Sequence, residues 1–248
     1  MLQVKDLYKS YQVGRQTYPV LRGITFSIEP GEFVSVMGPS GSGKTTLLNC
    51  ISCYIPFDQG EILLDGQDIS KFNETDLSHL RNQKLGFVFQ DFMLLDGLTV
   101  KENIMLPRIL SGQTDKEMER SADRLCQVFD ISHIQEKYPA EISGGEKQRT
   151  AVARALINHP LLVLADEPTG NLDSKSGRTV IESFLQAQHS LNATIFMVTH
   201  DSYAASFCDR VILLKDGVVH KHLKSGKDRK EFQKELLDSI QEMSGEGR

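Results

Sequence analysis

The sequence predicts an α/β fold: a mixed central sheet with helices, an antiparallel β-subdomain and an inserted α-helical subdomain. Three observations predict it. Short apolar runs at Gly86–Phe89, Leu161–Leu164 and Thr194–Val198 have no polar side, which is typical of central parallel strands covered by helices. Residues 1–37 alternate between apolar and polar side chains as half-buried strands do. Between residues 91 and 155 the apolar period becomes that of helices.

The first strands end at a turn. The alternating apolar residues before the turn dipeptide Pro30-Gly31 are Ile24, Phe26 and Ile28. This alternation favours a half-buried antiparallel edge. A later strand, Glu61–Leu64, leads into Asp65-Gly66, a dipeptide that accepts the positive φ values of a tight hairpin turn.

The helical part is predicted by a capping-box pattern at Thr114–Glu117 and by the spacing of the apolar residues that follow it. Those residues are Met118, Ala122, Leu125, Cys126 and Phe129. Because they recur every three or four positions, they share one face of a helix. A second helical stripe is predicted near the end of the chain, at Phe232, Leu236, Leu237, Ile240 and Met243.

We therefore expect a single domain over residues 1–248. Its α/β core and antiparallel β-subdomain would be residues 1–90 and 156–220, its helical subdomain residues 91–155, and its helical extension residues 221–248. The extension would pack either on this core or on a partner.

Composition excludes several classes of protein. A net charge of −5 argues against a protein that mainly grips nucleic acid. The four cysteines have no framework spacing, which favours a reducing compartment. No signal-like start and no long apolar stretch is present, so the chain is expected to be soluble.

The stretch Gly38–Thr45 fits the pattern G-x-x-x-x-G-K-[ST] and lies between an apolar strand and an apolar helix. Glycines let the backbone approach a phosphate closely, and a helix N-terminus adds partial positive charge. Lys44 would reach the β- and γ-phosphates, and the Thr45 hydroxyl would bind Mg²⁺. The alternative is a glycine-rich turn with an incidental lysine.

A second element is the apolar strand Leu161–Leu164, which ends in two carboxylates, Asp166 and Glu167. Ligands gather at the carboxyl ends of parallel strands, so both acids are expected beside the phosphates. Asp166 would orient Mg²⁺ or its waters, and Glu167 would polarise the attacking water. The alternative is a solvated strand end.

A third element, Ile142–Arg149, resembles the LSGGQ signature of the ATP-binding cassette (ABC) superfamily of P-loop ATPases. Other motifs resemble that family in the same order: Tyr11 the residue that stacks on adenine, Gln90 the Q-loop glutamine, Asn171-Leu172-Asp173 the D-loop and His200 the switch histidine. Tyr8 or Tyr18 could stack on adenine instead of Tyr11.

The resemblance implies a nucleotide sandwich of two chains, in which the signature of one faces the phosphate loop of the other. It implies catalytic roles for Lys44, Gln90, Glu167 and His200, and Mg²⁺ ligation by Thr45, Gln90 and Asp166. The nucleotide-binding residues that it implies are Tyr11, Gly38, Pro39, Ser40, Gly41, Ser42, Gly43, Lys44, Thr45, Thr46, Ser143, Gly144, Gly145 and Asp173.

The signature departs from the family pattern at Glu146, which stands where glutamine is usual. Ser143 and Glu146 still suit a capping box that opens a helix. A carboxylate near a triphosphate could weaken ATP affinity. Cys50 and Cys53, at C-x-x-C spacing on the helix after the phosphate loop, lack a second ligand pair and are expected to be packing residues.

The segment Asp91–Val100 is apolar for a stretch that follows a hinge, which indicates either a docking surface or core burial. In the resembled transporters this region receives a coupling helix of a separate membrane permease. Residues 91–107, 170–177 and 204–211 resemble the ATPase subunits of Bce-type peptide-resistance transporters, within the macrolide-export and lipoprotein-release group.

This resemblance implies a bacterial ATPase subunit at the cytoplasmic face of the membrane, with Mg²⁺ and ATP as cofactors, a second copy and a permease as partners, and often a sensor kinase beside them. Rival interpretations are a cassette for lipoprotein release or cell division, and a nucleotide-sensing scaffold that does not cycle. A soluble cassette acting on ribosomes or DNA is disfavoured, because those carry two cassettes or a long inserted coiled coil.

Overall fold

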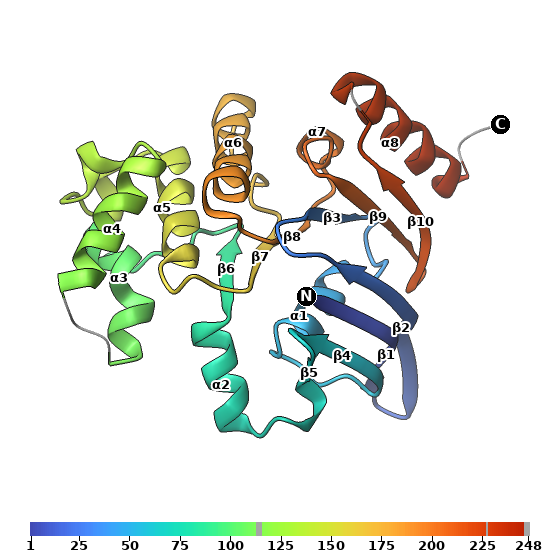
Figure 1. The fold of residues 1–248 in the computed structure, drawn as a ribbon. Helices are drawn as coiled ribbons and strands as arrows, with labels where there is room; N and C mark the ends of the chain where they lie inside the picture. The colour runs from blue at the N-terminus through green and yellow to red at the C-terminus, as the bar shows by residue number, and fades with distance from the viewer. Residues whose placement is uncertain (113–115, 227, 246–248) are drawn as a thin grey trace. The chain divides into compact units, whose positions relative to one another are not determined.

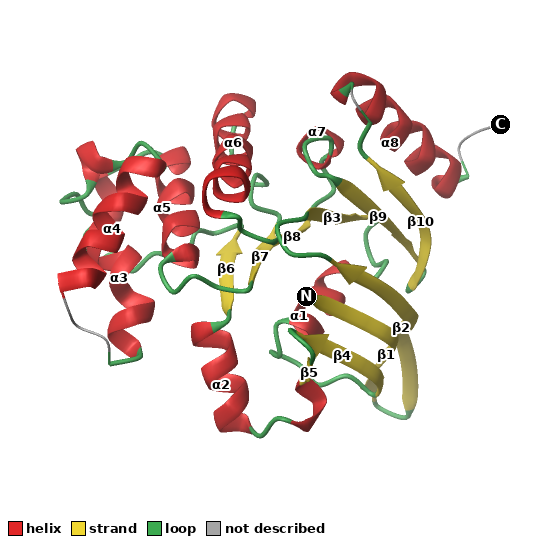
Figure 2. Cartoon of the chain, in the orientation of Figure 1, coloured by secondary structure: helices red, strands yellow, loops and turns green. Residues whose placement is uncertain are grey.

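A computed structural model describes residues 1–112, 116–226 and 228–245. The chain forms two compact units, one of Met1–Leu77 with Phe196–Arg248 and one of Ser78–Ile195 (Figures 1 and 2). Among the described residues, none of the helices has the length and apolar character needed to cross a bilayer.

The first unit contains an antiparallel sheet in the order β2-β1-β4-β5. Its strands are β1 (Leu2–Val13), β2 (Gln16–Ile28), β4 (Gln59–Leu64) and β5 (Gln67–Asp68). The predicted antiparallel edge is confirmed, because β2 pairs only with β1 in this order and its buried residues alternate with exposed ones. The hairpin at Asp65 and Gly66 is also confirmed, since φ is 51° and 78° there.

A second group of strands in this unit follows the order β10-β9-β3-β8. They are β3 (Phe33–Met37), β8 (Ile195–Val198), β9 (Arg210–Lys215) and β10 (Val218–Lys224). The helices of this unit are α1 (Lys44–Ile51), the 3-10 turn η1 (Ile69–Lys71), α7 (Ser202–Ala205) and α8 (Arg229–Ser244). Strand β3 pairs in parallel with β9 and ends at Met37, directly before the glycine-rich loop.

The second unit holds β6 (Leu85–Phe89) and β7 (Leu162–Asp166), which pair in parallel as predicted. Its helices are α3 (Val100–Leu110), α4 (Lys116–Val128), α5 (Gly144–Leu156) and α6 (Ser174–Leu191), with the 3-10 turns η2 (Ser132–Ile134) and η3 (Pro139–Glu141). Helix α2 (Glu74–Gln83) runs across the boundary of the two units. Figure 1 shows α3, α4 and α5 gathered together.

The predicted helical stripe is confirmed: Met118, Ala122, Leu125 and Cys126 are buried on α4, and Phe129, just after the helix, is buried too. The capping box predicted at Thr114–Glu117 falls partly on residues 113–115, which lie outside the described residues. The subdomain boundaries proposed from the sequence stay a prediction.

Helix α8 packs on the first unit through one face. Its buried residues Phe232, Leu236 and Met243 join a core cluster with residues of β3, α7, β9 and β10, and Ile240 packs against that cluster. The prediction that Leu237 belongs to this stripe is wrong: its side chain is 45% exposed. Successive residues of a helix are about 100° apart, which turns Leu237 away from the face that Leu236 buries.

Replacing Leu236 by alanine is expected to destabilise the protein by about 2–5 kcal/mol, since it leaves a cavity in this cluster. The matched control is Leu237→Ala on the same helix, where an exposed side chain is worth within about 0.5 kcal/mol. Thermal unfolding of both variants beside the parent measures the difference. Equal melting temperatures for the two variants would contradict this account of α8.

Candidate functional site

The glycine-rich loop Gly38–Thr45 connects β3 to α1, as its sequence context predicts. Gly41 has φ of 78° and Gly43 has φ of 101°, values that a residue with a Cβ rarely adopts. Gly43 is the N-cap of α1. Because its own side chain is absent, the N-terminus of this helix stays open to an anion.

Gly38 is fixed by a close backbone approach. A Cβ at this position would lie 2.0 Å from the carbonyl oxygen of Leu214 on β9, so no side chain fits. The loop is tied to the same region again at Ser42, whose carbonyl accepts the Gly217 N–H at 3.2 Å. The shape of the glycine-rich loop is therefore set by β9 and by the turn after β9, which lie far from the loop in sequence.

Lys44 folds back over the loop. Its Nζ donates to the carbonyls of Gly38 and Pro39, at 2.9 Å each. The hydroxyl of Ser42 is buried and has no hydrogen-bond partner within the described residues. A loop with a buried unpaired hydroxyl, open glycine backbone and a lysine held above it suits a bound phosphate chain.

His200 lies in the same unit as this loop. The N–H of Thr199 donates to the Val36 carbonyl at 3.2 Å, which joins the end of β8 to β3 just before the glycine-rich loop begins. Asp201 then caps α7 by accepting the N–H of Tyr203 at 2.8 Å. His200 is therefore held between two fixed neighbours, and its side chain is exposed.

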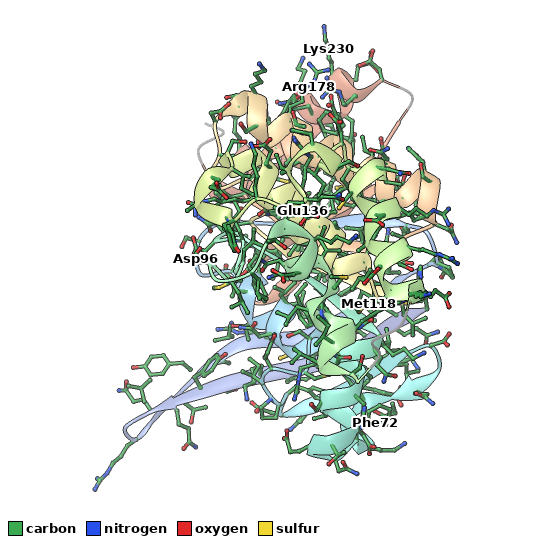
Figure 3. All side chains as sticks on the ribbon, turned by 90° about the vertical axis from the view of Figure 1, so that its left-hand side faces the viewer. Phe72, Asp96, Met118, Glu136, Arg178 and Lys230 are labelled. Atoms are coloured by element: carbon green, nitrogen blue, oxygen red, sulfur yellow. The ribbon has the colours of Figure 1, made fainter. Side chains whose placement is uncertain are left out.

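The tyrosines predicted to meet adenine lie on the β1–β2 hairpin, whose tip extends beyond its sheet in Figure 3. Tyr11 and Tyr18 are cross-strand partners and both are exposed. Lys9 lies 5.6 Å from the centre of the Tyr11 ring. Tyr8 sits over Gly23, with its Oη 2.9 Å from where a Cβ at Gly23 would be. All three rings remain candidates.

In the second unit, β7 ends at Asp166, as predicted, and Glu167 follows with a φ of 45°. A glutamate in the left-handed region is uncommon and is typical of functional sites. The carbonyl of Glu167 accepts the N–H of Gly170 at 3.0 Å, which turns the chain sharply after the strand. Both acidic side chains are partly exposed at the carboxyl end of a buried strand.

Gln90 is linked to the D-loop. Its Nε2 donates to Asn171 Oδ1 at 2.9 Å, and Asn171 Nδ2 donates to Asp91 at 2.7 Å. Gly170 also packs against Gln90, because a Cβ on Gly170 would meet the Gln90 amide at 3.0 Å. The loop that holds Gln90 and the loop that holds Asn171 are thus in direct contact.

Asp173 has a structural role in this unit. Its carboxylate caps α6, accepting the N–H groups of Lys175 and Ser176 at 2.9 and 3.0 Å and the Ser176 hydroxyl at 2.6 Å. These hydrogen bonds lower the pKa of the Asp173 carboxyl, and the hydrogen bond from the Ser176 hydroxyl has the largest effect. Its predicted contact with nucleotide stays a prediction.

Ser143 caps α5 in the predicted capping box: its hydroxyl accepts the Glu146 N–H, and Glu146 accepts the Ser143 N–H. Gly144 and Gly145 pack against the start of α6, near Leu172 and Ser176. The first turn of α5 thus rests on the D-loop segment of its own unit.

Several residues that shape these loops were not singled out from the sequence. Asn103 is fully buried and binds the segment before α3: its amide donates to the carbonyls of Leu95, Leu98 and Thr99, and its oxygen accepts the Leu95 N–H. Arg154 donates to the carbonyls of Phe92 and Met93. Burial lowers the pKa of Arg154 to about 10. A polar residue inside an apolar helix pattern is the only sequence signal for either.

Of the two cysteines expected to be packing residues, Cys50 is buried and Cys53 is partly buried. Cys50 and Cys208 are buried, and burial raises the pKa of the Cys50 thiol to about 12, so the reactive thiolate is disfavoured. The prediction that Cys53 lies on the helix after the phosphate loop is wrong. The helix α1 ends at Ile51, and Cys53 follows it with a φ of 61°.

Oxygen ligands are the donors available for a metal. Among the described residues there is no group of three or more His, Cys, Asp or Glu side chains that could hold an ion. The Mg²⁺ ligation predicted for Thr45, Asp166 and Gln90 stays a prediction; their hydroxyl, carboxylate and amide oxygens are hard donors of the kind that Mg²⁺ prefers.

Comparisons with known proteins agree with these motifs. The family model described as "ABC transporter" matches residues 21–170. The ABC transporter ATP-binding protein YxdL of Bacillus subtilis is 46% identical over 245 residues, which is 99% of this chain and 95% of that protein. The bacitracin export ATP-binding protein BceA of Halalkalibacterium halodurans is 44% identical over 238 residues, 96% of this chain and 94% of that protein.

Among solved structures, the chain is similar to a dimeric post-hydrolysis state of the ATP-binding cassette MJ0796 bound to ADP and Pi. The TM-score is 0.81 at 37% identity, covering 92% of this chain and 100% of that one.

Proposed function

This chain belongs to the ABC transporter family as its ATP-hydrolysing subunit, and we propose that two copies close on two Mg-ATP and reopen after hydrolysis, driving a separate membrane permease. The observation that carries the proposal is the glycine-rich loop. Its backbone excludes a side chain at Gly38, and its lysine lies over two loop carbonyls. A phosphate chain entering the loop would take over the lysine from those carbonyls.

Each side chain has a distinct role in the proposed reaction. Lys44 and the loop amides bind the β- and γ-phosphates, and His200 contacts the γ-phosphate. Glu167 accepts a proton from the attacking water. Thr45, Asp166 and Gln90 would hold Mg²⁺, which supplies charge neutralisation at the phosphates. Gln90 also links the site to the D-loop, because its amide donates a hydrogen bond to Asn171.

Dimerisation follows from the signature. The N-terminus of α5 presents the Ser143 hydroxyl and the amides of Gly144 and Gly145, donors typical of an anion site. The solved relative that resembles this chain is a dimer bound to ADP and Pi, which supports the same arrangement here. We propose that these donors bind the γ-phosphate held by the second copy.

The segment Asp91–Val100 suits permease docking better than core burial. Met93 and Leu95 are 56% and 50% exposed, although the backbone around them is held by Arg154 and Asn103. Apolar side chains presented on a fixed backbone form a surface prepared for a partner. The partner that fits is an apolar helix of the permease at the cytoplasmic face of the membrane.

We infer that the transporter protects a bacterium against antimicrobial peptides that act on the cell wall. The similarity to a bacitracin export ATP-binding protein over nearly the full length supports this substrate class, and a sensor kinase working through the permease belongs to the same proposal. A role in lipoprotein release or cell division is the second candidate. It would be favoured if the copurified permease carried no link to peptide resistance.

The docking proposal predicts that Met93→Ser with Leu95→Ser lowers copurification of the permease about 10-fold or more, since both apolar anchors are lost. ATP binding by the isolated subunit should not change. The control is Leu110→Ser, which alters a side chain in the same unit that is 72% exposed and lies outside the segment. Affinity purification from membranes, with the permease quantified by mass spectrometry, gives the result. Equal recovery of the permease with both variants would contradict the docking site.

A further inference from the structure

We propose that His133 is a positioning residue for the signature: through Glu146 it decides whether the Ser143 hydroxyl can donate to a γ-phosphate. The inference rests on the proposed function, in which Ser143 meets the nucleotide of a second copy. It concerns three side chains of one unit, carried by η2 and by the start of α5.

The three side chains form a chain of contacts. Oε2 of Glu146 accepts two hydrogen bonds from Ser143, from its N–H at 2.8 Å and from its hydroxyl at 2.7 Å. The other oxygen, Oε1, lies 3.3 Å from Nε2 of His133. Glu146 therefore faces the signature serine with one oxygen and a histidine with the other.

The hydroxyl of Ser143 has a single proton, and here that proton points to Glu146. An ionised carboxylate only accepts hydrogen bonds, so in the contact between Glu146 and the Ser143 hydroxyl the serine must be the donor. While this contact persists, Ser143 cannot donate to phosphate. The negative charge of Glu146 at the mouth of an anion site opposes the phosphate as well.

Glu146 is held in its charged form. Burial alone would raise its pKa, but hydrogen bonds from Ser143 and His133, together with the charge of Arg149, outweigh burial and lower it. The charged and titratable groups acting on this carboxylate are thus His133 on η2 and Arg149 on α5 itself. Arg149 acts on Glu146 through its charge, whereas His133 contacts Oε1 directly, which makes His133 the partner to vary.

His133 is open to solvent, because 59% of its side chain is exposed. Histidine is the residue type that changes charge near neutral pH. An imidazolium at Nε2 donates to Oε1 and compensates the carboxylate, which weakens its hold on the Ser143 hydroxyl. A neutral ring leaves the charge of Glu146 uncompensated on that side. ATP-driven closure is therefore expected to be firmer when His133 is protonated.

The substitution Glu146→Gln separates charge from structure. Glutamine keeps the capping box of α5 and removes the negative charge, so folding is retained. With a neutral amide at this position, His133 has no carboxylate to compensate. The effect of His133 should disappear in that background.

The experiment uses the full chain with Glu167→Gln, so that the ATP-bound dimer is not lost to hydrolysis. Sedimentation gives the ATP concentration for half-maximal dimer formation at about pH 6 and about pH 8, where histidine changes charge. Four proteins are compared: this background alone, with Glu146→Gln, with His133→Gln, and with both. Phosphate groups titrate equally in all four, so differences between them isolate the pair.

Glu146→Gln is expected to lower the required ATP concentration about 5-fold, the low end of coupling between linked sites. His133→Gln is expected to raise it about 3-fold at the lower pH, the scale of an exposed ion pair, and to have no effect in the Glu146→Gln background. Equal effects of His133→Gln in both backgrounds, or at both pH values, would overturn the inference. If no protein dimerises with ATP, the proposed function fails; if all dimerise equally, only this inference fails.

Discussion

Replacing Glu167 by glutamine is expected to lower ATP turnover by ~10²–10⁴-fold, the usual range for loss of a positioned proton acceptor. The residue stands just after β7, where a positive φ and the Gly170 N–H to its carbonyl fix the turn. Glutamine has the same shape as glutamate, and a positive φ is no less favourable for glutamine than for glutamate. The substitution therefore removes the proton acceptor and leaves the loop in place.

Because binding is retained while hydrolysis is slowed, the Glu167→Gln protein should accumulate as an ATP-bound dimer. Phosphate release and sedimentation with ATP measure the two effects on the same preparation. Glu182→Gln is the matched control: it removes an exposed carboxylate of α6, paired with Arg178 at 2.8 Å, and should leave turnover unchanged. Near-normal phosphate release by the Glu167 variant would remove this residue from its role.

The local parts of the fold could be predicted from the sequence because short-range chemistry determines them. The Asp65-Gly66 hairpin follows from two residues that tolerate positive φ, and the capping box of α5 follows from Ser143 and Glu146 three positions apart. The glycine-rich loop is likewise recognisable from Gly38–Thr45 alone. In each case the partners are neighbours in sequence.

Contacts between distant segments could not be predicted in this way. That Gly38 lies against the Leu214 carbonyl depends on the register of β3 beside β9, and nothing in the glycine-rich loop itself specifies it. The hydrogen bonds from Arg154 to the loop before α3 span some sixty positions, and those residues share no pattern. Even the His133–Glu146 contact, between nearby segments, depends on a 3-10 turn that periodicity does not reveal.

The same limit explains the error at Leu237. An apolar residue next to a buried one fits a broad helical stripe on paper, but the width of the buried face is set by the elements against which α8 packs. Phe232, Leu236 and Met243 are buried in the cluster that those elements form, and Ile240 packs against it, whereas Leu237 is exposed.

Lys44→Ala is expected to weaken ATP binding by about 30-fold or more. A lysine contact with a phosphate at ~4 Å is worth roughly 4 kcal/mol at an effective dielectric near 20, and about half remains after desolvation is subtracted. The change also removes the two hydrogen bonds from Nζ to the carbonyls of Gly38 and Pro39, which shape the loop before nucleotide enters. Both effects lower affinity in the same direction, because alanine neither binds the phosphates nor holds the loop.

Isothermal titration with ATP, and thermal unfolding with and without ATP, measure this loss independently. The parent should unfold at a higher temperature with ATP, since a ligand that binds only the folded chain stabilises it; the Lys44 variant should not. Lys71→Ala is the control in the same unit, because it removes an exposed lysine paired with Asp68 at 3.0 Å and leaves the cradle intact. If the Lys44 and Lys71 variants bound ATP equally well, the lysine held over the loop would be a structural brace, and the phosphate site would have to lie elsewhere.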